Sequence, residues 1–314
     1  MTASPAHVDV SVLIATRDRA PLLAATLASL AGQRAQGVAW EAIVVDNGSS
    51  DDTAGVLRSA VGSLPLVSLN EPTPGKNKAM NRALAAARGW LLLFSDDDVL
   101  ADPDWIAEMA AAAGRWPGDD VFGGEVRLAF PEGTPAWLRE PFHPALNFAR
   151  YGAAEPEGPT DRLPNGPNFA VRARALADLR FSESIGPDGT GSYAMGSETE
   201  MLERLRARGC RFIYAPRAAV CHVVQRQQLR TRYLLGRSYR LGRGEVRRRP
   251  RRGTAVPRVL GAPRHLWREM LVAGLGWVSS VPRGRRNRLD AALRLARIWG
   301  MISEHRANPP RSDS

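Results

Sequence analysis

The sequence is poor in cysteine and lysine and contains no long hydrophobic stretch. Its two cysteines, Cys210 and Cys221, are too few for a disulfide framework, so we expect free thiols with structural or inert roles. The longest apolar runs fall well below the roughly 18 residues that a membrane-spanning helix needs. Residues 1–5 lack the basic and apolar regions of an export signal. These absences favour a cytoplasmic protein, and its 314 residues allow a sizeable core.

Charge is distributed unevenly along the chain. Residues 1–222 hold 21 basic and 27 acidic residues, a net charge of −6, whereas residues 223–314 hold 22 and 5, a net charge of +17. This tail is densest in arginine at 247–252, and tryptophans accompany arginines in two predicted amphipathic helices, at 266–281 and 289–302. Such a tail can contact the anionic inner face of a membrane, pack on the body of the protein or bind nucleic acid. Nucleic acid is the least favoured of the three, because the tail has no recognisable nucleic-acid-binding motif.

Strand and helix patterns alternate over about the first 100 residues. The predicted strands are 8–15, 40–45, 64–69 and 91–95, and the predicted helices are 21–30, 51–59 and 76–88. This alternation predicts an α/β fold with parallel strands and right-handed crossovers. Further along, we predict a helix that starts at Asp102, a strand at 121–130, long loops at 131–166, a helix at 197–208 and a strand at 211–214.

Acidic residues follow two of these strands. Asp96, Asp97 and Asp98 come directly after the apolar run 91–95, and Asp46 ends the run 41–45. Three neighbouring carboxylates repel each other unless a cation lies among them. Open α/β sheets bind ligands beyond the carboxyl ends of their strands, so both groups of acids are expected at one site. The sequence therefore predicts a metal-dependent enzyme.

Seven segments together resemble the family 2 glycosyltransferases of the GT-A type, which transfer sugars from nucleotide-sugar donors. In chain order, these segments are 10–16, 44–49, 75–81, 94–98, 166–168, 196–200 and 220–222. The resemblance implies a Rossmann-like, mostly parallel sheet flanked by helices. It also implies a catalytic domain over 1–225, with a nucleotide-sugar half at 1–115 and an acceptor half at 116–225. The arginine-rich composition after His222 predicts a basic, mostly helical extension at 226–314.

The resemblance also assigns roles to the acidic residues. The triplet matches the family's Asp-any-Asp motif, so Asp98 is expected to ligate a metal and Asp96 to lie near the ribose or the metal. Asp97 is expected to contact the donor. His222 matches a histidine that completes the metal site. Imidazole and carboxylate ligands suit Mn²⁺, and Mg²⁺ is the alternative. Asp46 matches a residue that binds the base or ribose, unless it only orders an Asx turn.

Other residues of the matching segments are expected to contact the donor. Thr16 occupies a nucleotide-binding position, and Arg17 replaces the tyrosine that is usual there, so that it can stack on a base or reach phosphate. Lys76 and Lys78 are the chain's only lysines, and Lys76 is a candidate for a phosphate or sugar contact. Asn81 matches a family asparagine on the same helix.

The general base is expected at Glu198. Inverting transfer needs a carboxylate that deprotonates the acceptor hydroxyl, and Ser197-Glu198 stands where the family has Glu-Asp. A competing interpretation makes Ser197 and Glu200 a helix capping box, which leaves Glu198 free. Asp188 is the reserve candidate.

Together, these residues predict an inverting glycosyltransferase that uses a nucleotide-diphosphate-sugar donor and a divalent metal. Its expected acceptor is a hydroxyl of a glycan or a lipid-linked saccharide, with Trp137, Phe142 and Tyr151 as a stacking platform or simply a cover for the core. A nucleotidyltransferase of related fold and a basic nucleic-acid-binding protein are the alternatives.

Overall fold

The computed structural model describes residues 7–152, 155–248, 257–280, 282 and 284–308. Residues 1–5, the arginines of the run 247–252 beyond Arg248, and residue 281 lie outside these ranges. The chain forms two compact units. The first unit comprises Met1–Ala129, Ala149–Glu183 and Ser197–Val223, and the second comprises Phe130–Phe148, Ser184–Gly196 and Val224–Ser314. Two internal segments therefore group with the C-terminal part of the chain. A single boundary at residue 225 does not describe this division, because both segments precede it.

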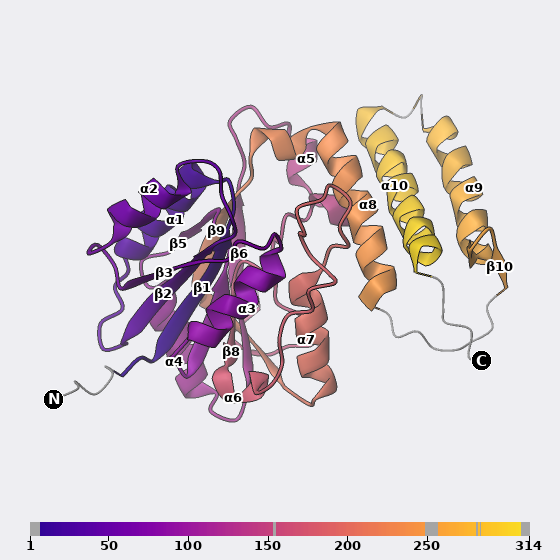
Figure 1. The fold of residues 1–314 in the computed structure, drawn as a ribbon. Helices are drawn as coiled ribbons and strands as arrows, with labels where there is room; N and C mark the ends of the chain where they lie inside the picture. The colour runs from indigo at the N-terminus through magenta and orange to yellow at the C-terminus, as the bar shows by residue number, and fades with distance from the viewer. Residues whose placement is uncertain (1–6, 153–154, 249–256, 281, 283, 309–314) are drawn as a thin grey trace. The chain divides into compact units, whose positions relative to one another are not determined.

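The first unit is built on one mixed, mostly parallel sheet (Figure 1). Its strand order is β3-β2-β1-β4-β8-β6-β9-β5, and β7 pairs with β9. The strands are β1 Val10–Thr16, β2 Trp40–Asp46, β3 Leu66–Asn70, β4 Leu91–Ser95, β5 Val99–Ala101, β6 Val121–Ala129, β7 Gly158–Pro159, β8 Phe169–Arg172 and β9 Phe212–Val223. Strands β3, β2, β1 and β4 run parallel, as the alternation of strands and helices predicts.

Two apolar layers cover the sheet, because neighbouring residues of a strand point to opposite faces. Val12 and Ile14 of β1 pack in one core cluster with leucines of α1 and with Trp105 of α4, whereas Leu13 packs in another with α3 and α7. The helices of this unit are α1 Ala20–Ala31, α2 Thr53–Ala60, α3 Lys76–Ala86, α4 Trp105–Arg115, α6 Ala173–Leu176 and α7 Ser197–Ala207. Both faces of the sheet are thus buried, which explains the continuous apolar runs of its central strands.

Three predicted elements differ from the structure. The strand predicted at 211–214 extends over twelve residues as β9, because it pairs with β6 along its length and with β5 near its end. Helix α4 begins at Trp105 rather than Asp102, whose carboxylate instead pairs with Arg127. The predicted loop region 131–166 contains short elements: α5 Ala136–Arg139, the 3-10 helix η1 Pro144–Leu146, and β7.

The second unit is mainly helical. Its elements after residue 224 are the 3-10 helix η2 Arg226–Leu229, α8 Thr231–Arg248, β10 Arg258–Val259, β11 Ala262–Pro263, α9 Arg264–Ser279 and α10 Arg285–Ala307. The buried Glu304 of α10 pairs with Arg243 and Arg247 of α8 at 2.8 and 2.6 Å. Among the described residues, no helix combines the length and apolar composition needed to cross a bilayer.

Close packing of α8 on α10 depends on facing glycines. A Cβ on Gly300 would lie 2.0 Å from the backbone oxygen of Tyr239, and one on Gly242 would lie 1.9 Å from that of Arg297. Backbone atoms cannot yield as a flexible side chain can, so Gly300→Ala is expected to destabilise the protein by about 1–3 kcal/mol. Chemical denaturation followed by circular dichroism measures this change.

Gly274 of α9 provides the matched control, since a Cβ there has no heavy atom within 4 Å. Gly274→Ala removes a helical glycine without a clash and should stabilise the protein by up to about 1 kcal/mol. Equal effects of the two substitutions would contradict the close helix crossing.

Candidate active site

The polar residues predicted for the donor site lie at one edge of the sheet. In the parallel register of β1 and β2, Thr16 is opposite Asp46, and Ile14 of β1 is opposite Ser95 of β4. The triplet Asp96–Asp98 follows β4 directly. The carboxyl ends of three parallel strands therefore bring these side chains to a common edge, as the sequence predicts.

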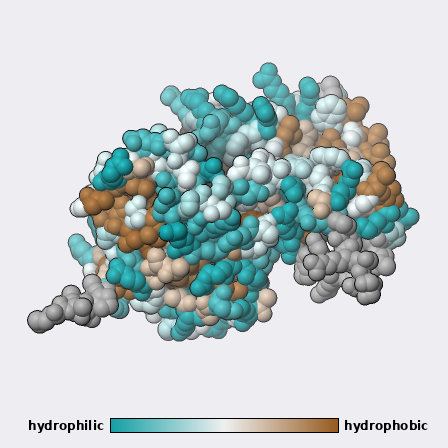
Figure 2. All heavy atoms as spheres, viewed as in Figure 1, coloured by the Kyte–Doolittle hydropathy of each residue, from teal (hydrophilic) through white to brown (hydrophobic). Residues whose placement is uncertain are grey.

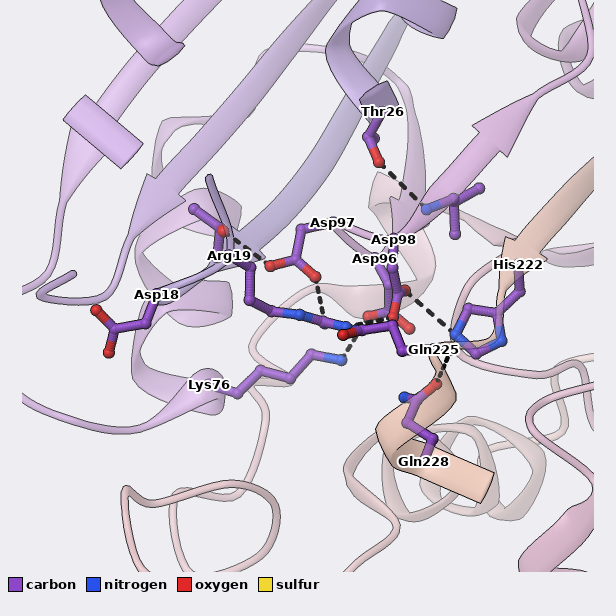
Figure 3. A network of polar contacts seen from close by, with 12 residues as sticks. Asp18, Arg19, Thr26, Lys76, Asp96, Asp97, Asp98, His222, Gln225 and Gln228 are labelled. Carbon is purple, nitrogen blue, oxygen red and sulfur yellow. Dashed lines mark hydrogen bonds and ion pairs between the residues drawn. The ribbon is translucent and has the colours of Figure 1, made fainter. Parts of the chain in front are cut away.

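An arginine that sequence reasoning missed lies along the acidic triplet (Figure 3). Nη1 of Arg19 donates to Oδ1 of Asp97, and Nη2 donates to Oδ2 of Asp98, both at 2.5 Å. Thr16 Oγ1 donates to the other oxygen of Asp97 at 2.8 Å. Asp97 and Asp98 are only 3% and 4% exposed. Arg19 thus supplies, from the protein itself, part of the positive charge that the triplet requires.

The two buried carboxyls differ in their electrostatics. Burial raises the pKa of Asp97 to about 6, although the Arg19 charge opposes the shift. Burial also acts on Asp98, but His222 and Arg19 more than offset it and hold the pKa of Asp98 below its ordinary value. Asp98 is therefore the more firmly ionised of the two acids.

The loop that carries Arg19 is fixed to the loop after β2. Asp18 adopts a φ of +51°, in the left-handed region that few residues other than glycine enter. Its Oδ1 accepts hydrogen bonds from the Ser50 N–H at 2.6 Å and the Ser50 hydroxyl at 2.9 Å, while its own N–H donates to Ser49 Oγ. These bonds compensate for the strained backbone and place Arg19 beside the triplet.

Lys76 joins the triplet to the predicted base. Its Nζ donates to Oδ1 of Asp96 and to Oε1 of Glu198, each at 2.7 Å. Burial would lower the pKa of Lys76, but the two carboxylates raise it well above its ordinary value. Burial would likewise raise the pKa of Glu198, but the Lys76 charge holds it below its ordinary value. Glu198 is therefore ionised at neutral pH and able to accept a proton.

The turn before α3 sets the position of Lys76. Gly75 has a φ of +146°, which favours glycine, and its N–H donates to Oδ1 of the buried Asn47 at 2.8 Å. The Asn47 amide also donates to the carbonyls of Glu71 and Thr73. Asn47 therefore connects the end of β2 to the start of the lysine-bearing helix.

The start of α7 leaves Glu198 free of helix capping. Ser197 is the first residue of the helix, and its buried Oγ has no hydrogen-bond partner among the described residues. Glu200 instead pairs with Arg204 at 2.9 Å. The capping-box interpretation is thus not what the structure shows. The reserve candidate Asp188 belongs to the second unit, where it accepts hydrogen bonds from Thr190.

His222 lies beside Asp98 because β5 and β9 pair with Val99 opposite His222. The two side chains approach to 3.2 Å between His222 Nε2 and Asp98 Oδ1. Adjacent ligands of an octahedral ion with bonds of about 2.2 Å are about 3 Å apart, so this pair fits a divalent metal. Asp96 is engaged by Lys76, and within the described ranges no three His, Cys, Asp or Glu side chains are gathered as a metal site.

Three predicted donor contacts have other partners in the structure. Arg17 is exposed and lies 3.6 Å from Asp18. Both side-chain groups of Asn81 bond the backbone of Phe181, at 2.8 and 3.0 Å. Asp46 Oδ1 accepts the Ser49 N–H at 2.9 Å, in the turn that was the alternative interpretation.

The proposed aromatic platform does not lie in a single unit. Trp137 and Phe142 contact each other in the second unit, with ring centroids 6.3 Å apart. Tyr151 belongs to the first unit, where it is buried against Tyr214. Tyr151 is therefore a core residue of the first unit.

Asn168 of the 166–168 motif is a structural residue that sequence reasoning did not interpret. It is fully buried, and its amide donates to the carbonyls of Glu125 and Ala218 at 2.8 and 2.7 Å. Its Oδ1 accepts from Trp105 Nε1 at 2.8 Å. The preceding Gly166 would place a Cβ 3.1 Å from the Glu198 side chain. This motif therefore joins the sheet and α4 to the surroundings of Glu198.

Comparison with known proteins identifies a matching family and several relatives. The model of the family described as glycosyl transferase family 2 matches residues 11–180. A PGL/p-HBAD biosynthesis glycosyltransferase of Mycobacterium tuberculosis (strain ATCC 25177 / H37Ra) is 30% identical over 184 residues, which are 55% of this chain and 67% of that protein. An uncharacterized protein of Sinorhizobium fredii, y4gI, is 39% identical over 229 residues, which are 68% of this chain but only 24% of that protein.

Solved structures share the fold. A mannosyltransferase from Pyrobaculum calidifontis in complex with GDP-Man and Mn²⁺ superposes with a TM-score of 0.56 at 19% identity, over 94% of this chain and 72% of that one. TarS 1–349 of S. aureus in complex with UDP-GlcNAc gives 0.56 at 17% identity, over 95% and 90%. The expected GT-A-type fold is thereby confirmed.

The mostly parallel sheet, with acids at its carboxyl edge, is of the GT-A type. The chain belongs to glycosyl transferase family 2, because the family model matches more than half of it. It is accordingly a glycosyltransferase, in agreement with the sequence-based prediction.

Proposed function

We propose that this glycosyltransferase inverts the anomeric configuration of its sugar and uses a divalent metal and Glu198 as general base. The donor is a nucleotide-diphosphate sugar, and the acceptor is a hydroxyl of a glycan or lipid-linked saccharide. Support comes from one observation above all. Lys76 lies 2.7 Å from both Asp96 and Glu198, so a single side chain separates the proposed donor-binding acid from the proposed base.

This arrangement suits displacement at the anomeric carbon. The acceptor hydroxyl must lose a proton while the diphosphate leaves from the opposite face of the sugar, so the base and the phosphate-binding group must lie close but apart. Glu198 would take the proton, and Lys76 and Arg19 would balance negative charge near the leaving group. Residues Asp98 and His222, with Asp96 beside them, would hold a Mn²⁺ or Mg²⁺ ion, which when bound neutralises diphosphate charge.

Donor binding tests the metal assignment. Asp98→Ala is expected to abolish metal-dependent binding of the nucleotide diphosphate, because Asp98 is the more firmly ionised of the two buried acids Asp97 and Asp98. Isothermal titration with UDP and GDP, each with Mn²⁺ and with chelator, measures this loss.

Asp178→Ala is the matched control, since the Asp178 side chain is 81% exposed and pairs with Arg208 on the surface. It should bind as the unmodified protein does. If the Asp98→Ala variant bound the nucleotide as tightly as the unmodified protein does, both in Mn²⁺ and in chelator, Asp98 would not belong to the donor site.

For the second unit, we propose contact with an anionic membrane surface through α9. Leu271, Val272, Leu275 and Val278 are between 63% and 73% exposed, and Figure 2 shows hydrophobic side chains gathered over this helix. Exposed arginines precede and follow these apolar residues along the chain: Arg264, Arg268, Arg285, Arg286 and Arg288. An apolar helix face bordered by cations matches the boundary between acyl chains and anionic headgroups.

Vesicle sedimentation tests this surface. Leu275→Asp should weaken binding to vesicles rich in phosphatidylglycerol by about tenfold or more, since one buried leucine contributes about 1.5–3 kcal/mol. Val61→Asp in the first unit, where Val61 is 68% exposed, is the control and should bind normally. Equal sedimentation with neutral and anionic vesicles would rule out the proposed contact.

A further inference from the structure

The arginines of α8 fall into two groups with different partners. Arg243 and Arg247 share the buried carboxylate of Glu304, as described above. Arg237 and Arg240 have no carboxylate partner among the residues that the structure describes. Tyr233, Arg237 and Arg240 are spaced by four and three residues, so they lie on one face of the helix.

Aromatic rings surround these two guanidinium groups. The Arg237 guanidinium carbon lies 5.4 Å from the ring centroid of Phe148, a residue of the same unit. That of Arg240 lies 5.0 Å from the ring of Tyr193 and 5.8 Å from the ring of Tyr233. The rings remove water from the flat faces of the guanidinium groups and leave the N–H edges to bind a ligand.

The donors at these edges are largely unused. Nε of both arginines is buried and has no hydrogen-bond partner in the described structure. Arg240 Nη1 donates to the Gly191 carbonyl at 3.3 Å, and Arg237 interacts with the side chain of Tyr233. Arg297 differs from these two arginines. Its Nε is also buried without a hydrogen-bond partner in the described structure, but its Nη2 pairs with Glu245 at 2.5 Å.

Two neighbouring cations without an anion are electrostatically unfavourable. Burial lowers the pKa of Arg237 below its ordinary value, Tyr233 and Tyr193 oppose this shift, and the like charge of Arg240 adds to it. A bound dianion would relieve both effects, and it would interact more strongly here than in water because the rings lower the local dielectric constant.

We propose that Arg237 and Arg240 form a binding site for a phosphate or diphosphate group, separate from the donor site. Phosphate suits the pair better than carboxylate does, because it carries about two negative charges near neutral pH and three oxygens that a guanidinium fork can engage in pairs. The assignment of this group to a phosphate of the sugar acceptor rests on the proposed function, whereas the site itself does not.

Titration with inorganic pyrophosphate in the presence of chelator tests the site in the full-length protein. The unmodified protein should bind pyrophosphate although chelator removes any divalent metal, because neither metal nor donor is involved. The double variant Arg237→Gln, Arg240→Gln should bind at least tenfold more weakly. The double variant Arg237→Lys, Arg240→Lys keeps both charges but loses the fork, and should also bind several-fold more weakly. The circular dichroism spectra of both double variants show whether their fold is intact.

A charge-matched control separates a site from general attraction. Arg264→Gln, Arg268→Gln removes two exposed charges from α9 and should leave pyrophosphate affinity unchanged. The proposal would be overturned by equal binding of pyrophosphate to the unmodified protein and to the Arg237/Arg240 variants, by equal weakening in the α9 control, or by the absence of pyrophosphate binding in chelator. A failure of the donor experiment above would not affect this result, since no nucleotide or metal is used.

Discussion

Glu198→Gln is expected to lower the rate of sugar transfer by about 10²-fold or more while donor binding persists. Glutamine has nearly the same shape as glutamate but cannot accept the acceptor's proton. Its amide oxygen can still face Lys76, whose ammonium contacts Glu198 Oε1 at 2.7 Å and is also held by Asp96. The loss should therefore appear in kcat rather than in the affinity for the nucleotide, which steady-state kinetics and a parallel binding titration distinguish.

Glu200→Gln is the appropriate control, since Glu200 lies on the same first turn of α7 but pairs with Arg204. It should retain nearly full activity. If Glu198→Gln turned over at a normal rate while Glu200→Gln did not, the role of base would move to Glu200. Normal turnover in both variants would instead make Asp188 the candidate for the general base.

Among the substitutions discussed, a replacement of Arg19 is expected to cause the largest decrease in the free energy of unfolding. Arg19→Gln leaves Asp97 and Asp98 buried without their shared counter-ion, and loss of one partner from a buried ion pair costs about 3 kcal/mol or more. Mn²⁺ should raise the Tm of this variant more than that of the unmodified protein, because added positive charge compensates for the missing guanidinium. Differential scanning calorimetry with Mn²⁺ and with chelator measures both effects.

Arg17→Gln controls for the general loss of positive charge in the same loop. Arg17 is exposed, and its substitution should change stability by no more than about 0.5 kcal/mol. A similar Tm for the two variants would show that Arg19 is not the counter-ion of the triplet.

Much of the fold and of the acidic edge of the sheet was predictable because both depend on local patterns. Buried parallel strands are continuous apolar runs, and their carboxyl ends meet at one edge. Asp46 and the acidic triplet were therefore expected at one site from strand ends alone, whereas Thr16 was assigned through family resemblance. Glu198 and His222 were identified by family resemblance, since nothing in their local sequence shows which strand or helix they face.

Arg19 was missed because its function depends on a distant contact. It lies three residues beyond Thr16, in a loop with another arginine, and its partners are 78 and 79 residues away in sequence. The one available signal was the triplet itself, which requires nearby positive charge whether or not a metal is bound. The left-handed backbone at Asp18, which directs Arg19 rather than Arg17 to the acids, has no clear sequence signature.

The organisation of the second unit was also not predictable from periodicity. One of its internal segments, Phe130–Phe148, lies almost entirely in the region 131–166 that was expected to form long loops. Helix patterns identified α9 and α10, but they could not show that Gly242 and Gly300 would permit the close approach of α8 to α10. Helix patterns also could not show which arginines of α8 form ion pairs with a glutamate.

The most direct test of the central claim is the thermal stability of the purified protein with a panel of nucleoside diphosphates and nucleotide sugars, each with Mn²⁺ and with chelator. Ligand that binds only the folded state raises the Tm. We predict a metal-dependent rise with one nucleobase, which would also identify the donor. No rise with any nucleotide in either condition would contradict the assignment of the acidic edge as a donor site.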